Sequence, residues 1–219
     1  MQVIPNLQGA IIAYMPIEEA LAKATPQLRY RQAPKSANPK RQRELTAVRA
    51  LLFCALNREV DILYDQYGKP YLADFSYHIS ISHTSRWVAI ILHATKQVGI
   101  DIELIAARVA KVRTKFLSVA ENQGVLPHDY ATLTTYWCAK EAVYKWYGKK
   151  EVDFANHLKI QAPPLLPILP TTQTISALPL ILDMPILMQP ILLSVNYTII
   201  APDVVIAWVV ASCLINNSL

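Results

Sequence analysis

Short β-rich runs alternate with longer helical patterns along this chain of 219 residues. Three β-rich runs follow one another closely: 77–82, 87–94 and 98–103. Helical patterns are expected over three stretches: 40–56, 106–116 and 130–147. The last pattern stops at Gly148, and glycine is a common helix terminator. A similar rhythm of strands around one long helix recurs in each half, which is compatible with a duplicated α/β fold.

Shorter segments complete this outline. A strand is expected over 9–15, a short helix over 17–24, and two strands over 192–214. Prolines among basic residues over 25–39 predict an exposed loop. The stretch 163–190 contains many of the 15 prolines of the chain. Because proline at that density excludes regular helix and central strand, we expect short edge strands and turns there.

The composition narrows the class of protein. Hydrophobic residues make up 53% and charged residues 17%, which predicts a packed globular protein and excludes intrinsic disorder. The net charge of +5 suits an acidic partner or a phosphorylated ligand, although many proteins carry it without either. Three widely spaced cysteines form neither a disulfide framework nor a zinc pattern. The start lacks a signal-peptide pattern and the apolar runs are too short to span a bilayer, so a cytoplasmic location is expected.

The run VGIDIE, residues 98–103, places two carboxylates on one strand. Residues i and i+2 of a strand point to the same face, so Asp101 and Glu103 project together, ~7 Å apart at the backbone. Two adjacent carboxylates are costly unless a cation neutralises them, and Mg²⁺ prefers oxygen ligands. An isolated D-x-E is more often a solvated strand end, so this pattern needs support from elsewhere in the chain.

The run WCAKEAVYKWYG, residues 137–148, supplies that support. Glu141 and Lys145 are four residues apart and therefore neighbours on one helix face. Such a pair is usually a surface ion pair, but aromatic residues flank this one and indicate a mostly covered helix. Lys140 lies on a different face of the helix, from which it could reach a phosphate.

Two further segments carry groups suited to an anion. In HISISHTSRW, residues 78–87, Ser82 and His83 stand where the strand should end and could donate hydrogen bonds to a phosphate. A single histidine at a strand end is more often structural. Lys69 stands on a turn, and the helical stretch 40–56 carries several basic residues: Lys40, Arg41, Arg43 and Arg49.

In their order along the chain these segments resemble the 4'-phosphopantetheinyl transferase superfamily, in its longer, Sfp-type branch. The order is a basic helix, G-K-P, S-H-T, V-G-I-D-I-E and W-x-x-K-E-x-x-x-K, over roughly residues 40–150. The last two motifs are specific in combination. The resemblance implies two pseudo-symmetric lobes, 1–98 and 99–219, each a small, mostly antiparallel sheet packed by a long helix. Coenzyme A would bind in the cleft between them.

The resemblance also implies roles for residues in the motifs. The metal ligands would be Asp101, Glu103 and Glu141, holding Mg²⁺ or Mn²⁺. The catalytic groups would be Asp101, Glu141 and Lys145, with Lys145 on the phosphates. Glu141 is a candidate base for the attacking serine, and a metal-bound water is the alternative.

The contacts to coenzyme A follow in the same way. The residues that the resemblance places against it are Lys69, Ser82, His83, Lys140 and Lys145, with His83 near the 3'-phosphate. An arginine would contact the adenylate end, and Arg43 matches better than Arg49, although the choice between them stays open.

The activity implied is transfer of the phosphopantetheine arm of coenzyme A to a serine of an apo acyl or peptidyl carrier protein, releasing 3',5'-ADP. Such carriers are typically acidic, which suits the net charge. Neither nucleic acid nor membrane is an expected partner, and a monomer is expected. The alternatives are a coenzyme A-binding regulatory module that has lost transfer, and a structural protein whose carboxylates only decorate the surface.

Overall fold

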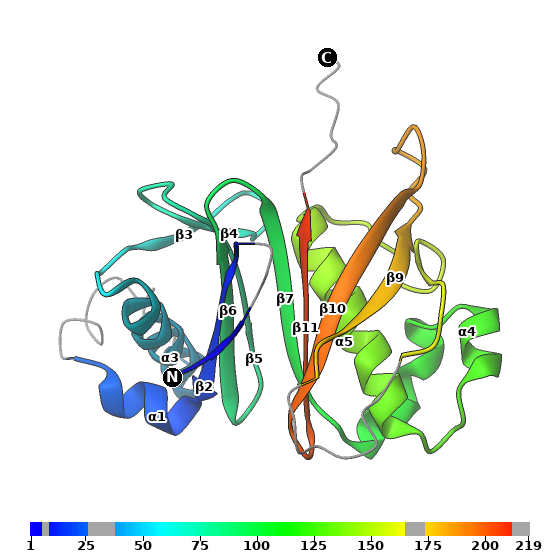
Figure 1. Ribbon diagram of the computed structural model, residues 1–219, viewed down its shortest axis with the longest axis horizontal. Helices are drawn as coiled ribbons and strands as arrows, with labels where there is room; N and C mark the ends of the chain where they lie inside the picture. Colours follow the sequence, from blue (N-terminus) through cyan, green and yellow to red (C-terminus); the bar gives the residue numbers. More distant parts are fainter. Residues whose placement is uncertain (6–8, 26–37, 165–173, 212–219) are drawn as a thin grey trace. The chain divides into compact units, whose positions relative to one another are not determined.

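The structure is a computed structural model, and it describes residues 1–5, 9–25, 38–164 and 174–211. It is a mixed α and β protein in which every described strand pair is antiparallel, so the expected α+β class is confirmed. The chain separates into two compact units, Met1–Thr95 and Lys96–Leu219. Each unit has its own sheet and its own long helix (Figure 1).

The first unit is built on a four-stranded sheet in the order β1-β2-β6-β5. Its strands are β1 (Gln2–Ile4), β2 (Ile11–Pro16), β5 (His78–His83) and β6 (Trp87–His93). Helices α1 (Ile17–Lys23) and α3 (Pro39–Leu56) pack against each other and against this sheet. A two-stranded hairpin, β3 (Ile62–Tyr64) and β4 (Pro70–Leu72), completes the unit.

Helix α3 begins and ends where its sequence provides caps. The side chain of Asn38 accepts a hydrogen bond from the Lys40 amide, and Pro39 takes the first helical position. Asn57 ends the helix in the left-handed conformation, with φ of 52°. The residues that the helix buries in the first core are Ala47, Val48, Ala50, Leu51 and Leu52.

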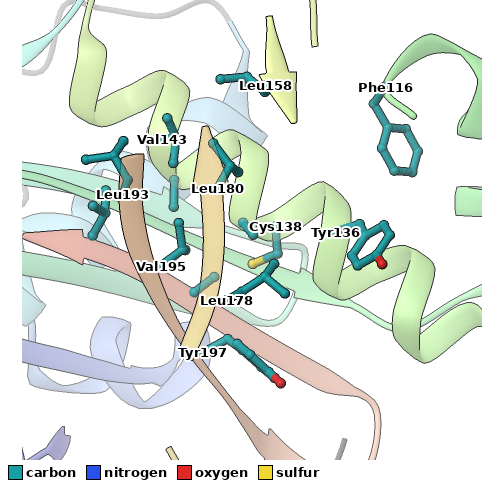
Figure 2. Close-up of a cluster of buried hydrophobic side chains, with 14 of the residues drawn as sticks. Phe116, Tyr136, Cys138, Val143, Leu158, Leu178, Leu180, Leu193, Val195 and Tyr197 are labelled. Carbon is teal, nitrogen blue, oxygen red and sulfur yellow. The ribbon is translucent and has the colours of Figure 1, made fainter. Parts of the chain in front are cut away.

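The second unit has a five-stranded sheet in the order β7-β11-β10-β9-β8. Its strands are β7 (Gln97–Leu104), β8 (Leu158–Ile160), β9 (Ser176–Leu182), β10 (Ile191–Ala201) and β11 (Val204–Ala211). Helix α5 (Tyr130–Tyr147) packs along β7, β11 and β10. In Figure 2 the side chains of β9 and β10, among them Leu180, Val195 and Tyr197, gather beside this helix.

Helix α5 has the ends that its sequence predicts. Asp129 caps its first turn by accepting a hydrogen bond of 3.0 Å from the Thr132 amide. Gly148 ends it with φ of 70°, a left-handed conformation that glycine adopts at little cost. The predicted end of the helix is therefore confirmed.

Two segments differ from the sequence-based expectation. The stretch expected as a helix over 106–116 forms a 3₁₀ helix, η1 (Ala107–Lys115). It is followed by α4 (Val119–Gly124), which was not expected and begins with a capping box between Ser118 and Glu121.

The expectation that the proline-rich stretch would contain no central strand is wrong for β9. This strand contains Pro179 and still pairs with neighbours on both sides, β10 and β8. The carbonyl of Pro179 accepts a hydrogen bond from Gln161, so its missing N–H faces the side of β8. Strand β8 ends at Ile160, so the missing N–H falls just beyond the last paired residue of that strand, and only the one reciprocal bond to Gln161 is lost. Residues 165–173 of the stretch, and most of the loop expected over 25–39, lie outside the described residues.

Candidate functional site

Strand β7 presents two carboxylates and a glycine to the same helix. Asp101 pairs with Ala207 and Glu103 with Val205 of β11, in regular antiparallel register. A Cβ atom added to Gly99 would meet helix α5, so the face of β7 that carries Gly99 also directs Asp101 and Glu103 toward that helix. The expected side-by-side projection of these two residues matches this register.

Gly99 allows α5 to approach β7 more closely than any other residue would. The added Cβ would lie 1.9 Å from the carbonyl oxygen of Ala142 and 2.7 Å from the amide nitrogen of Trp146. Both are helix backbone atoms, which cannot move aside as a flexible side chain could. The missing side chain therefore sets the distance between the strand that carries Asp101 and the helix that carries Glu141 and Lys145.

An ion pair links the helix to the strand. Lys145 Nζ donates to Oδ1 of Asp101 at 2.6 Å, and the Asp101 side chain is only 5% exposed. Burial alone would lower the pKa of Lys145, but the Asp101 carboxylate outweighs it and the pKa is raised. Lys145 therefore stays charged, and it neutralises the most buried carboxylate of the group.

The two other carboxylates respond to the same charge. Burial, and then the negative charge of Asp101, raise the pKa of Glu141 to about 7. Burial and Asp101 also raise the pKa of Glu103, while a hydrogen bond of 2.9 Å from Trp137 Nε1 to its Oε1 opposes the rise. Asp101, Glu103 and Glu141 therefore share one electrostatic environment that disfavours three negative charges.

Such an environment is chemically suited to a divalent cation, because three carboxylates supply hard oxygen donors and excess negative charge. In the conformation described, the ammonium of Lys145 provides the positive charge beside Asp101. Among the residues that the structure describes, no three His, Cys, Asp or Glu side chains come close enough together to hold a metal ion. The donor types thus fit Mg²⁺, whereas the ligand set expected from the sequence stays a prediction.

A groove of about 770 Å³ opens beside Glu141. Three aromatic rings, two valines and four charged side chains line it: Trp137, Tyr144, Phe154, Val112, Val152, Lys115, Glu141, Glu151 and Asp153. The rings pack on one another, with centroid distances of 5.6 Å between Trp137 and Phe154 and 5.5 Å between Tyr144 and Phe154. The groove can therefore take a slender, partly apolar chain whose end lies near a carboxylate.

Lys140 has a different environment from the one expected. Its side chain is 0% exposed, and Nζ donates to the carbonyls of Phe116 at 2.7 Å and Phe154 at 3.0 Å, and to Glu121 at 2.7 Å. A lysine ammonium has three donors, and all three are used. The expectation that Lys140 contacts coenzyme A is therefore not carried further.

In the first unit one expected residue, His83 at the end of β5, lies beside two residues of α3. His83 Nε2 lies 3.1 Å from Nη1 of Arg41, and both lie 3.6 Å from the carboxylate of Glu44. The resemblance in the motifs had indicated Arg43 or Arg49, and not Arg41, for the adenylate end. Helical spacing explains the difference, since residues 41 and 44 share one face of α3 and the residue between them does not.

The remaining residues of this unit take different places. Arg43 pairs with Glu18 of α1, and Arg49 lines a small cavity with Arg58. Ser82 is buried on β5. Lys69 lies in the turn before β4, and its positive charge helps lower the pKa of His78, after the larger effect of burial. Lys69 is thus close enough to the β5 strand to act on it electrostatically.

Known proteins were compared with this chain. Residues 97–171 match the family model of the 4'-phosphopantetheinyl transferase superfamily. By this match the segment is similar to the 4'-phosphopantetheinyl transferase superfamily. The resemblance inferred from the motifs is thereby confirmed, and the segment contains Asp101, Glu103, Glu141 and Lys145.

Two of the proteins that this chain resembles are themselves named as 4'-phosphopantetheinyl transferases. A protein of Haemophilus influenzae, provisionally named a 4'-phosphopantetheinyl transferase, is 32% identical over 96 residues, 41% of each chain. The 4'-phosphopantetheinyl transferase AcpT of Escherichia coli K12 is 34% identical over 124 residues. That alignment covers 53% of this chain and 62% of AcpT. The chain therefore spans less than two thirds of the length of either relative.

Proposed function

We propose that this protein is a 4'-phosphopantetheinyl transferase that moves the phosphopantetheine arm of coenzyme A to a serine of an apo carrier protein. The observation that carries the proposal is the meeting of β7 and α5, where Lys145 bonds to Asp101 beside Glu103 and Glu141. It lies inside the segment that matches the superfamily. The same reasoning makes Mg²⁺, with Mn²⁺ as a substitute, the expected metal.

The residues present suit the chemistry of this transfer. The serine oxygen forms a bond to the phosphorus that carries the arm, the bond from that phosphorus to the second phosphate breaks, and 3',5'-ADP leaves. A bound Mg²⁺, held by Asp101, Glu103 and Glu141, would supply charge neutralisation at the pyrophosphate. Lys145 adds a second positive charge on the same face, in a partly covered position where it is weakly screened.

The serine also has to lose a proton. Glu141 lines the groove, so its carboxylate can approach a hydroxyl group held there, directly or through one water. The groove itself suits the pantetheine arm, which is slender and carries both amides and methyl groups. The aromatic rings of Trp137, Tyr144 and Phe154 offer the surface for it.

The basic groups of the first unit suit the nucleotide end of coenzyme A. Arg41 and His83 lie together, so both can donate to one phosphate, and we assign them to the 3'-phosphate. Lys69 and Ser82 stay candidates for further contacts, and so do Arg43 and Arg49. The acidic surface typical of carrier proteins suits the net charge of +5. The Sfp-type two-lobed arrangement, a monomeric state and a cytoplasmic location belong to the same proposal. None of the described helices is long and apolar enough to cross a membrane.

A mass-shift assay tests the proposal. The protein is mixed with coenzyme A, Mg²⁺ and each of a panel of apo acyl and peptidyl carrier proteins. The expected result is a gain of one phosphopantetheine arm on at least one carrier, abolished by Asp101→Asn and kept by Asp183→Asn, which alters an exposed ion pair with Lys159. Tight coenzyme A binding without transfer to any carrier would favour the alternative, an inactive coenzyme A-binding module.

A further inference from the structure

Helix α5 carries a fully buried lysine one residue before Glu141. The ammonium of this residue, Lys140, donates to two backbone carbonyls, one from the segment before α5 and one from the segment after it. Phe116 lies just after η1, whereas Phe154 lies in the segment that follows α5. The third bond goes to the carboxylate of Glu121, which is itself 6% exposed.

Glu121 extends this connection to two more elements. Its Oε2 accepts from the amide of Ser118 at 2.7 Å, which closes the capping box of α4. Its Oε1 accepts from the amide of Ile160 at 2.7 Å, at the end of β8. The pair therefore ties α5 to η1, α4, β8 and the segment after α5 through charge-assisted hydrogen bonds.

The two carbonyls that Lys140 holds belong to residues whose rings touch Trp137. The Phe116 ring meets the indole edge-to-face at 5.2 Å, and the Phe154 ring lies against it at 5.6 Å. The indole Nε1 in turn donates to Oε1 of Glu103 at 2.9 Å. A continuous path of contacts thus runs from the buried ammonium to one of the carboxylates of the site.

We propose that Lys140 and Glu121 form a positioning pair, which holds Trp137 and thereby orients Glu103 and the aromatic wall of the groove. The inference rests on the proposed function only for its effect on turnover. Lys140 touches neither substrate nor metal in this role. It acts by holding the backbone of Phe116 and Phe154, whose rings pack against Trp137.

A positioning role can be distinguished from a purely stabilising role by comparing two kinds of substitution in the buried ion pair. Removing one partner is costly because the other charge is left buried and unpaired. Replacing both partners by apolar residues of similar volume is often neutral or stabilising. A pair retained only for stability could therefore be replaced without loss of function, whereas a pair that orients other groups could not.

The test uses three variants of the full chain. Lys140→Met leaves Glu121 unpaired, so its unfolding midpoint in urea is expected to fall. The double variant Lys140→Met/Glu121→Gln removes the unpaired charge and keeps an acceptor for one of the two amides that Glu121 binds, so it is expected to regain part of that loss, which keeps the test open if the single variant does not fold. Lys159→Met is the matched control, since Lys159 forms an exposed ion pair with Asp183.

Steady-state transfer kinetics give the first readout. In the double variant kcat is expected to fall about 10- to 100-fold, as a misplacement of catalytic groups by ~1 Å can do, while KM for coenzyme A is unchanged. Wild-type kcat in the folded double variant would overturn the proposal. So would a rise in KM for coenzyme A with unchanged kcat, because it would mean that Lys140 contacts the ligand.

The indole N–H resonance of Trp137, assigned with Trp137→Phe, gives a second readout without any substrate. In the double variant it is expected to shift and to exchange faster with solvent than in wild type, because the bond to Glu103 is disturbed. An unchanged signal would overturn the positioning role. If the wild-type protein transfers to no carrier, the proposed function fails, yet this resonance still decides whether the pair positions Trp137.

Discussion

Replacing Gly99 by alanine should force strand β7 and helix α5 apart. The new Cβ would lie 1.9 Å from the Ala142 carbonyl oxygen, whereas ordinary van der Waals contact begins at 3.4 Å. The helix must therefore retreat by up to 1.5 Å (3.4 − 1.9) at this point, or its backbone must distort. One extra carbon in a packed core usually costs about 1–3 kcal/mol, and an obstacle made of helix backbone places this change at the upper end. The gain of about 0.4–1 kcal/mol from replacing glycine in the unfolded chain offsets only part of that.

The same displacement of the helix should also lengthen the hydrogen bond between Lys145 and Asp101. Asp101 is only two residues further along the strand, and this bond is 2.6 Å long. We expect a transfer rate lower by about 10²-fold. Urea denaturation measures the stability, and the carrier assay measures the rate. Gly124→Ala is the matched control, since no atom lies within 4 Å of its new Cβ and helix α4 should tolerate it. A Gly99→Ala protein with the wild-type unfolding midpoint and transfer rate would refute the reasoning.

Three further predictions concern single side chains. Lys145→Met should leave the Asp101 carboxylate buried without its counter-charge, lowering kcat/KM about 100-fold or more in the carrier assay and the unfolding free energy by ~2 kcal/mol. Ser118→Ala removes the N-cap of α4 and should cost about 1 kcal/mol in urea denaturation, with no change in KM for coenzyme A. Burial opposes a low pKa at Asp74, but hydrogen bonds from Arg58 and Ser76 lower it to about 2. A carboxyl group with a lowered pKa in the folded state stabilises the protein above its unfolded value of 3.8, and this contribution disappears as the pH falls toward 2. Wild type should therefore exceed Asp74→Asn in stability at pH 6, by less than about 1 kcal/mol because the pair is exposed, and should match it near pH 2.

Local sequence patterns predicted part of the fold and part of the arrangement at the candidate site. Asp101 and Glu103 could be placed on one face because strand periodicity is local, and Gly148 marked the end of α5 because glycine favours the left-handed conformation. What brings Lys145 to Asp101 is not local. It depends on the close approach at Gly99, and sequence spacing contains no information about that distance.

Other differences between the sequence-based expectations and the structure also have physical reasons. Pro179 looked incompatible with an inner strand, yet only the end of the neighbouring strand β8 decides whether its missing donor matters. Lys140 looked like a phosphate ligand because lysines are rarely fully buried. The partner that buries it, Glu121, lies in the capping box Ser118–Glu121, whose sequence pattern could have revealed helix α4. Arg41 could have been preferred to Arg43 from its helical spacing to Glu44, but its contact with His83 depends on the packing of α3 beside β5.

The burial of Lys140 also has a consequence for its chemical reactivity. Amine acylation by thioesters or by labelling reagents requires a neutral amine with an accessible lone pair. Lys140 offers none, because its ammonium has no exposed surface and its three protons are all bonded. Lys145 is 26% exposed, so a reagent can reach it, but its ion pair with Asp101 raises its pKa and keeps the amine protonated. Non-enzymatic acylation would therefore spare the first lysine of the W-x-x-K-E-x-x-x-K motif, and would reach the second only after its ammonium leaves Asp101 and loses a proton.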